Sequence, residues 1–439
     1  MNFPPLGGWP GCESTAQGPF VIPGSSTRPR YSMPHSIRLL SLAMLQASLL
    51  IAAASTSPQT LAATAPTVEV RAPDSFYDPP ANPPAKPGVL LRSEPLAEAS
   101  LPAGMRGWRI QYSTSVDDHT PATAVATVFA PTEMPAGPRP VITWEHGTTG
   151  LVQRCMPSLI SVPTEGIPAR DKIVKAGWVV VATDYSFTEK GGPHPYIIGE
   201  GEARAALDAT RAARQMPELS LDERTVVWGH SQGGHSALWT GIVAPRYAPD
   251  VKVLGVVGIA PAANMKDILE NNVAVNKRLG PYIAQAYSRF YPDVKFDQAI
   301  RPEARVAAHE IAGLCGFFPP QDPQRIQALT TTFEGPSLNL PADKALAARL
   351  EQNTANQPIP MPELIIQGLA DPVVLPSITQ RYVDERCKAS QRLEYWTVAE
   401  RDHGTIVRPG TPLEQPLMDW TQARFDGKAQ AQGCSTKPL

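Results

Sequence analysis

Residues 226–234 read Val-Val-Trp-Gly-His-Ser-Gln-Gly-Gly, and the pattern Gly-x-Ser-x-Gly falls at 229–233. This pattern is typical of a sharp turn between a strand and a helix, with the serine at its tip. Residues before it are β-branched or aromatic, and apolar residues after it recur at helical spacing. Glycine on either side of Ser231 leaves room for a closely approaching backbone. We therefore predict a nucleophile elbow, the alternative being a glycine-rich turn with an idle serine.

Strand-like and helix-like segments alternate on both sides of this turn. Residues 140–144, 177–183 and 251–259 are short, nearly continuous apolar runs, as in strands buried on both faces of a parallel sheet. Residues 105–113 and 123–130 instead alternate apolar and polar side chains, which favours an antiparallel hairpin. The fold class that follows is α/β, with a mostly parallel central sheet.

A long segment without strand signals interrupts this alternation. Residues 262–360 contain no convincing strand, and the sheet pattern resumes at 363–368, so we interpret the segment as a helical cap; the alternative is a second independent domain. The predicted organisation is a presequence and secretory signal (1–65), an extended leader (66–100), the α/β core (101–261 and 361–430), the cap (262–360) and a C-terminal tail (431–439).

Two later residues have the types that a serine nucleophile needs. Serine requires an imidazole to take its proton and a carboxylate to orient that imidazole. Asp371 follows the predicted strand 363–368, and His403, the one histidine beyond Asp371, follows the last predicted strand. We predict Ser231 as nucleophile, His403 as general base and then acid, and Asp371 as the orienting carboxylate. Asp402 is the alternative acid, and Asp371 before a proline could instead be a turn residue.

The oxyanion hole is expected where two backbone segments meet at the serine. One donor in such folds is the N–H of the residue after the nucleophile, which is Gln232 here. The other comes from a loop after an earlier strand, and the segment around His146 and Gly147 has that position. We predict a donor near Gly147, while a plain glycine turn is the alternative.

Charge and the N-terminal segment restrict the class of protein. Lys and Arg number 39 and Asp and Glu number 41, so the net charge of -2 does not favour binding to nucleic acid. Residues 39–54 form an apolar run shorter than the about 20 residues of a membrane span, and small residues follow it. We expect a cleaved signal and a secreted or periplasmic protein; a membrane anchor is the alternative.

Export affects the interpretation of the cysteines. Cys12 lies in the presequence, and the mature chain would retain an even number, which favours two disulfides in an oxidising compartment; sequence alone allows three pairings. The four are Cys155, Cys315, Cys387 and Cys434. Their spacing suggests no zinc site.

These motifs, taken in order, resemble the secretory lipase family, whose members include fungal lipase A enzymes. The resemblance covers roughly residues 100–425, and its more specific parts are the elbow and the Gly-Gly-Pro-His-Pro-Tyr segment at 191–196. It implies an α/β-hydrolase fold with a cap between the sixth and seventh sheet strands, an acyl-binding tunnel and ester hydrolysis. It also implies the bridges Cys155 to Cys315 and Cys387 to Cys434. Fungal members carry an acidic residue at the position of His146, so their oxyanion geometry does not transfer.

We therefore expect a secreted serine hydrolase that cleaves carboxylic esters, as a lipase or an esterase. No cofactor or metal is implied. The substrate would be a small-molecule or lipid ester, the protein a monomer without a nucleic-acid partner, and the cap could make transient contact with a lipid interface. The alternatives are a peptidase or acyltransferase with the same triad, and a non-catalytic binding protein of the same fold.

Overall fold

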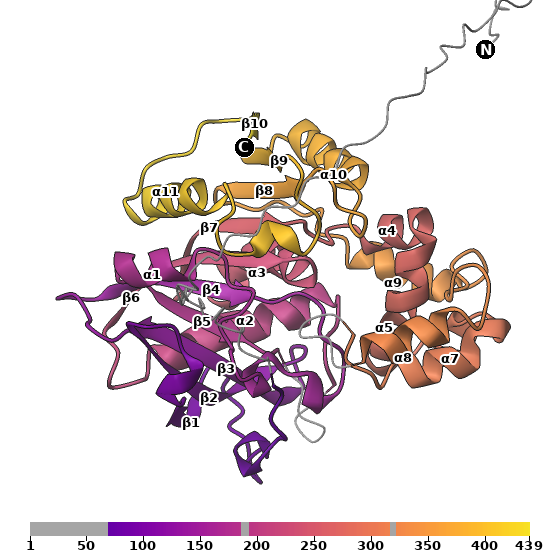
Figure 1. The fold of residues 1–439 in the computed structure, drawn as a ribbon, viewed down its shortest axis with the longest axis horizontal. Helices are drawn as coiled ribbons and strands as arrows, with labels where there is room; N and C mark the ends of the chain where they lie inside the picture. Colours follow the sequence, from indigo (N-terminus) through magenta and orange to yellow (C-terminus); the bar gives the residue numbers. More distant parts are fainter. Residues whose placement is uncertain (1–68, 186–192, 317–321) are drawn as a thin grey trace, which may run out of the picture. The chain divides into compact units, whose positions relative to one another are not determined.

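The computed structural model of the protein describes residues 69–185, 193–316 and 322–439. The predicted presequence and signal, residues 1–65, lie outside the described residues. The described chain forms one ten-stranded sheet in the order β1-β2-β3-β5-β4-β6-β7-β8-β9-β10 (Figure 1). Among the described helices, none is both long and apolar enough to cross a membrane.

The sheet is antiparallel at one edge and parallel elsewhere. The strands β1, β2, β3 and β5 pair antiparallel in that order, and from β5 onward each neighbour is parallel. The strands are β1 (Leu90–Pro95), β2 (Met105–Ser115), β3 (Pro121–Pro131), β4 (Arg139–Glu145), β5 (Val179–Thr183), β6 (Leu221–His230), β7 (Lys252–Ile259), β8 (Glu363–Gly368), β9 (Leu393–Val398) and β10 (Cys434–Pro438). The predicted hairpin is β2 and β3, and the predicted α/β class with a mostly parallel sheet is confirmed.

Helices cover both faces of the sheet. One face packs against α2 (Gly199–Ala213), α3 (Gln232–Tyr247) and α10 (Pro376–Lys388), and the other against α1 (Arg170–Ala176) and α11 (Glu414–Phe425). In β6 the alternation of a strand sends Val226 and Trp228 into one layer and Val227 into the other. This burial on both faces is why the central strands are continuously apolar in sequence.

The cap is helical, as predicted, and lies between β7 and β8. Its helices are α4 (Met265–Asn271), α5 (Val273–Phe290), α6 (Phe296–Ala299), α7 (Arg305–Ile311), α8 (Pro323–Thr330) and α9 (Lys344–Gln352). In Figure 1 they gather beside the sheet rather than on one of its layers. The resemblance placed the cap between the sixth and seventh strands; the structure has one more strand before it, because β1 forms within residues 66–100.

Both ends of the described chain add edge strands to the sheet. The segment predicted as an extended leader, residues 66–100, contributes β1, which pairs antiparallel with β2. The segment predicted as a tail, residues 431–439, contributes β10, which pairs in parallel with β9. Every residue of β10 is exposed, so its sequence has none of the apolar alternation that marks a strand.

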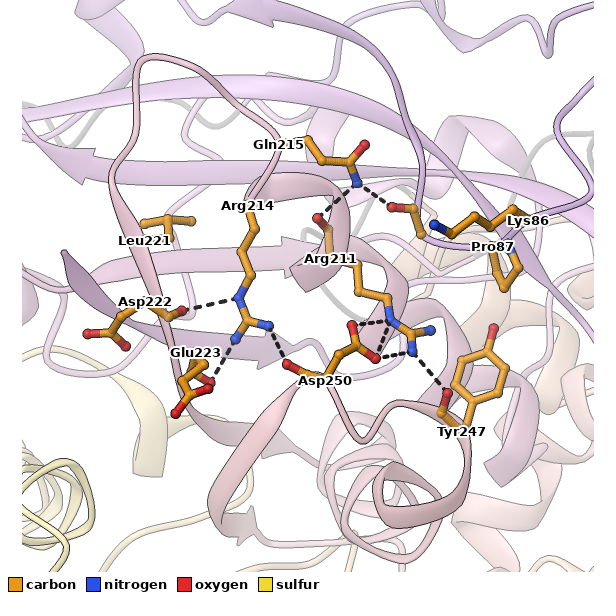
Figure 2. Close-up of a pocket in the computed structure, with 11 residues that line it drawn as sticks. Lys86, Pro87, Arg211, Arg214, Gln215, Leu221, Asp222, Glu223, Tyr247 and Asp250 are labelled. Atoms are coloured by element: carbon orange, nitrogen blue, oxygen red, sulfur yellow. Dashed lines mark hydrogen bonds and ion pairs between the residues drawn. The ribbon is translucent and has the colours of Figure 1, made fainter.

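A cavity of about 760 Å³ opens at the start of β6, where Leu221, Asp222 and Glu223 form part of its lining (Figure 2). The guanidinium of Arg214 donates to the carbonyl oxygens of Asp222 at 3.1 Å, Glu223 at 2.8 Å and Asp250 at 3.1 Å. The polar groups of this cavity therefore join the ends of β6, α2 and the loop before β7.

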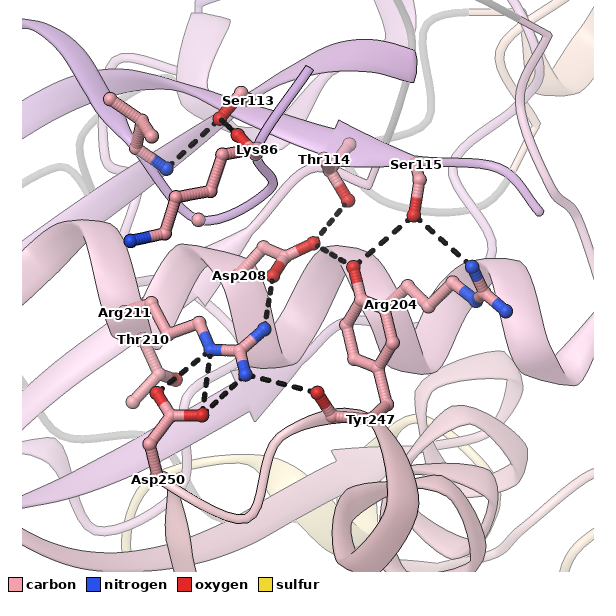
Figure 3. Close-up of polar contacts among 12 residues, drawn as sticks. Lys86, Ser113, Thr114, Ser115, Arg204, Asp208, Thr210, Arg211, Tyr247 and Asp250 are labelled. Atoms are coloured by element: carbon pink, nitrogen blue, oxygen red, sulfur yellow. Dashed lines mark hydrogen bonds and ion pairs between the residues drawn. The ribbon is translucent and has the colours of Figure 1, made fainter. Parts of the chain in front are cut away.

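Asp208 of α2 ties this region to the hairpin (Figure 3). Its carboxylate accepts hydrogen bonds from Thr114 Oγ1 at 2.8 Å and from Tyr247 OH at 2.7 Å, and it pairs with Arg211 at 3.1 Å. Burial raises the pKa of Asp208 to about 6. Three elements, β2, α2 and α3, thus share one buried carboxyl group.

Two disulfides have the pairing that the resemblance implies. Cys155 is bonded to Cys315 across 160 residues of sequence, which joins a loop after β4 to the segment of the cap between α7 and α8. Cys387 is bonded to Cys434 across 47 residues, which ties β10 to α10. The second bridge compensates for the lack of buried side chains in β10.

Removal of the two bridges should cost different amounts of stability. A bridge that closes a longer loop restricts the unfolded chain more, so Cys155→Ser/Cys315→Ser should lower the free energy of unfolding by about 1 kcal/mol more than Cys387→Ser/Cys434→Ser. Urea unfolding of the two double variants measures this difference. A larger loss from the Cys387 to Cys434 pair would mean that β10 and its contacts matter more than loop entropy.

Candidate active site

Ser231 has a strained backbone at the end of β6. Its φ is 58° and its ψ is -116°, a region that residues with side chains rarely adopt. A Cβ atom on Gly229 would lie 1.9 Å from the carbonyl oxygen of Gly233, and one on Gly233 would lie 1.8 Å from that of Glu145. The two glycines of the motif are therefore required by backbone contact, as the elbow prediction supposes.

The structure brings together the three residues predicted as a catalytic triad. Ser231 Oγ lies 2.8 Å from His403 Nε2, and His403 Nδ1 lies 2.7 Å from Asp371 Oδ2. The Asp371 side chain is fully buried, whereas His403 keeps 15% of its side chain exposed. Because the Asp371 oxygen accepts from Nδ1–H, Nε2 is left to accept the serine proton.

Asp371 is held by further hydrogen bonds to both of its oxygens. Oδ1 accepts from the backbone N–H groups of Val373 at 2.8 Å and Val374 at 3.0 Å, and Oδ2 accepts from Gln367 Nε2 at 3.1 Å. The buried acid is therefore kept oriented toward the imidazole.

Asp402, the alternative acid, has a different position. It is exposed, and its Oδ1 accepts from the backbone N–H groups of Gly404 at 3.0 Å and Thr405 at 2.7 Å. These hydrogen bonds lower the pKa of Asp402, that from Thr405 most. The residue caps the short turn that follows His403, and the structure gives it no contact with the imidazole.

Two residues that sequence reasoning missed hold the His403 loop in place. Gly368, at the end of β8, lies so close to the carbonyl oxygen of Arg401 that a Cβ atom would be 2.3 Å from it. His230 Nε2 donates to the carbonyl oxygen of His403 at 2.8 Å. Burial, and then the nearby His403, lower the pKa of His230 to about 3, so that it stays neutral.

The predicted oxyanion donors lie on either side of Ser231. Helix α3 begins at Gln232, so the N–H of this residue is among the first four of the helix, which have no partner within it. A Cβ atom on Gly147 would lie 3.4 Å from the Cβ of Ser231. Both segments are therefore adjacent to the serine.

Tyr185, to which the sequence assigned no role, orients the loop of Gly147. Its hydroxyl donates to the carbonyl oxygen of His146 at 3.1 Å. In a trans peptide the carbonyl and the following N–H point in opposite directions, so this bond turns the Gly147 N–H away from Tyr185. The sequence signal was weak, since Tyr185 is a single residue after β5; its φ of 59° becomes visible only in the structure.

The side chain of His146 is neutral and faces its own loop. Nδ1 donates to the carbonyl oxygen of Gly147 at 2.7 Å, and burial lowers the pKa of His146 to about 4. The neighbouring Glu145 accepts from Thr240 Oγ1 at 2.9 Å, and burial raises its pKa well above the usual range. A neutral acid and a neutral imidazole below the loop lack the charge that would compete with an oxyanion.

The cavity of Figure 2 lies at the opposite end of β6 from this site. Leu221 begins the strand, and Ser231 follows its last residue. Ligands of open α/β sheets bind at the carboxyl ends of the strands, where Ser231, Asp371 and His403 are found. Within the described residues no cluster of three or more His, Cys, Asp or Glu side chains has a geometry for a metal ion.

The sequence of the chain was compared with those of known proteins, and it matches a family. The family model described as "Secretory lipase" matches residues 170–433. Lipase 6 of Candida albicans is 25% identical over 394 residues, which covers 82% of this chain and 83% of that protein. The elbow, Asp371 and His403 all fall within the segment matched by the family model.

Two solved structures show the same fold. Candida antarctica lipase A in its closed state has a TM-score of 0.66 and 19% identity, over 83% of this chain and 89% of that chain. The rice cell wall degrading esterase LipA from Xanthomonas oryzae, in a ligand-bound form, has a TM-score of 0.57 and 19% identity, over 78% of this chain and 100% of that chain. At these identities the likeness concerns the fold.

The buried histidine of the loop should make folding sensitive to acid. The pKa of His146 falls from its usual 6.5 to about 4 in the folded protein, so between these values the unfolded chain binds a proton that the folded chain does not. Stability is then lost as pH falls below 6.5, at up to about 1.4 kcal/mol per pH unit. His146→Asn should reduce the difference between urea unfolding free energies at pH 7 and pH 5 by about 2 kcal/mol.

His119→Asn, at an exposed position, is the matched control and should keep the difference found in the unsubstituted protein. If the unfolding free energy changes between pH 7 and pH 5 by the same amount in His146→Asn and in the control, the imidazole of His146 binds its proton in the folded state.

Proposed function

The chain belongs to the secretory lipase family, and we propose that Ser231, His403 and Asp371 give it carboxylic ester hydrolase activity through a covalent acyl-enzyme. The observation that carries the assignment of these residues is the continuous line of hydrogen bonds from Ser231 Oγ through His403 to Asp371. Each of the three follows the carboxyl end of a parallel strand, so the sheet itself holds their spacing.

Catalysis begins with the attack of Ser231 Oγ on the ester carbonyl while His403 Nε2 takes the hydroxyl proton. The imidazolium that forms is stabilised by the buried Asp371. The N–H groups of Gln232 and Gly147 hold the oxyanion, each contributing on the order of 100-fold to 1,000-fold in rate. His403 then protonates the departing alcohol, and water, activated by the same imidazole, releases the acid from Ser231.

The substrate class is an uncharged ester with an apolar acyl group. Glu145 and His146, which flank the loop of Gly147 beside Ser231, are both neutral because of their burial. The cap carries exposed apolar side chains, with Val306 86% exposed and Val273 49% exposed. Contact of these residues with a lipid interface would bring the cap to an aggregated ester.

The protein acts outside the cytoplasm as a single chain. Its family is secretory, and two disulfides are stable in oxidising compartments. We further propose that a signal peptide is cleaved within residues 54–65 and that the protein is a monomer. Mass spectrometry of the exported protein and its hydrodynamic size report on these two features.

Substitution of the triad should separate the two candidate acids. Ser231→Ala should abolish labelling by a fluorophosphonate, which reacts with activated serines. Asp371→Asn should lower kcat by roughly 10,000-fold, because the imidazole loses the partner that fixes its tautomer. The control Asp402→Asn removes a turn cap beside the same histidine and should lower kcat by less than about tenfold. Labelling that persists in Ser231→Ala would contradict the assigned nucleophile.

A series of p-nitrophenyl esters from acetate to palmitate tests the reaction class. We expect hydrolysis that depends on Ser231, with kcat/KM varying along the series as the acyl group fills the site. The matched p-nitroanilides should react far more slowly, and an added alcohol should not outcompete water. Failure to hydrolyse any ester by a chain with intact thermal unfolding would rule out the hydrolase.

A further inference from the structure

A buried line of polar groups connects the cap to the residue that follows the nucleophile. We call the residues Gln232, Glu202, His235 and Asn353 the cap latch. Gln232 and His235 belong to the first turns of α3, Glu202 belongs to α2, and Asn353 caps the end of α9 in the cap. The side chains of Glu202 and His235 are completely buried, and Gln232 and Asn353 are 1% and 5% exposed.

Glu202 is the centre of the cap latch. Its Oε1 accepts from Gln232 Nε2 at 2.8 Å and from the backbone N–H of Ile197 at 3.0 Å. Its Oε2 lies 3.1 Å from His235 Nδ1. One carboxyl group therefore has three nitrogen partners, two of which come from the helix that starts at the nucleophile.

His235 carries the connection onward to the cap. Its Nε2 must bear a hydrogen, because its partner at 2.8 Å is the carbonyl oxygen of Asn353, which can only accept. Nδ1 makes the other hydrogen bond of the ring, to Glu202 Oε2, so both ring nitrogens have a partner.

Asn353 fastens the end of α9 to both core helices. Its carbonyl oxygen also accepts from Trp239 Nε1 at 3.0 Å, and its Oδ1 accepts from the backbone N–H of Gly199, the first residue of α2, at 3.0 Å. Its Nδ2 donates to Tyr291 OH of the cap at 2.8 Å. The cap therefore ends in hydrogen bonds to α2 and α3, close to their first turns.

Gln232 depends on this arrangement for its side-chain position. Within the described part of the chain its Oε1 is buried without a hydrogen-bond partner, so the bond from Nε2 to Glu202 is what holds the amide. The backbone N–H of the same residue is the donor assigned to the oxyanion hole. The carbonyl oxygen of the same peptide, that of Ser231, accepts from the backbone N–H of His235 at 3.1 Å, so both residues of α3 that contact Glu202 also hold this peptide.

We propose that Glu202 is a positioning residue for the oxyanion hole. Through His235, Glu202 links the position of the cap to the orientation of Gln232. The inference rests on the proposed function, since it concerns the donor at Gln232. Burial makes the link effective, because a polar group that loses its partner in the interior cannot turn to water instead.

The test compares Glu202→Gln with Glu363→Gln. Both replace a fully buried glutamate by its isosteric amide, but Glu363 begins β8, at the end of the sheet away from Ser231. The amide at position 202 has one accepting oxygen in place of two, so it cannot accept from both sides of the cap latch as the carboxyl group can. We expect kcat for a soluble ester to fall about 10-fold to 100-fold in Glu202→Gln, less than the loss of a whole donor, with KM changed less than about threefold. Glu363→Gln should keep kcat within about twofold of the unsubstituted protein.

A second variant, Gln232→Met, keeps the backbone N–H and the side-chain length but removes the bond to Glu202. It should lower kcat to a similar extent, and the double variant Gln232→Met/Glu202→Gln should be no slower than the slower single variant, because both break the same link. The rate of labelling of Ser231 by a fluorophosphonate should follow the same order.

The outcomes separate the two proposals. Equal kcat values in Glu202→Gln and Glu363→Gln, or losses that multiply in the double variant, would overturn the role of Glu202 and leave the Ser231 hydrolase intact. If Glu202→Gln unfolds at too low a temperature to be assayed, Gln232→Met provides the test. A kcat of Gln232→Met equal to that of the unsubstituted protein would then overturn the proposal. An unsubstituted chain that neither labels nor hydrolyses esters would overturn the proposed function, and the role of Glu202 with it.

Discussion

Ser231 keeps its unusual backbone because the chain on both sides of it packs backbone against backbone. Gly233 touches the carbonyl of Glu145 at the end of β4, and Gly229 touches the carbonyl of Gly233, so neither position has space for a side chain. This contact holds β4, β6 and α3 together at the point where the serine emerges. The loop of Gly147 follows β4 directly, which is why it is adjacent to the serine and not elsewhere on the sheet.

Hydrogen bonds, rather than exposed charges, organise the groups around this point. Asp371 is buried, but backbone N–H groups and Gln367 surround it, so it can serve the imidazole of His403 without a cationic partner. On the other side of the elbow, Glu145 and His146 stay neutral because burial penalises their charged forms.

The cap is fastened to the same core segments that carry the chemistry. The bridge between Cys155 and Cys315 joins it to the loop after β4, and Asn272 Nδ2 donates to the carbonyl of Pro372 at 2.8 Å, next to the acid. Asn353 joins it to α2 and α3. These contacts join the cap to α2, to α3 and to the loops that follow β4 and β8, so a displacement of the cap would disturb segments that surround Ser231.

Sequence by itself determined the α/β class, and it predicted the cap and the proposed triad Ser231, Asp371 and His403, because each of these leaves a local signal: a motif, a run of apolar residues, or a polar residue after a strand. Only the tertiary structure decided the edge strand β10, whose exposed residues have no pattern and whose pairing with β9 is non-local. The same holds for Tyr185 and Glu202. A single polar residue on a strand end or helix acquires a role only from the groups that folding brings within hydrogen-bond distance of it, and those groups come from other elements of the chain.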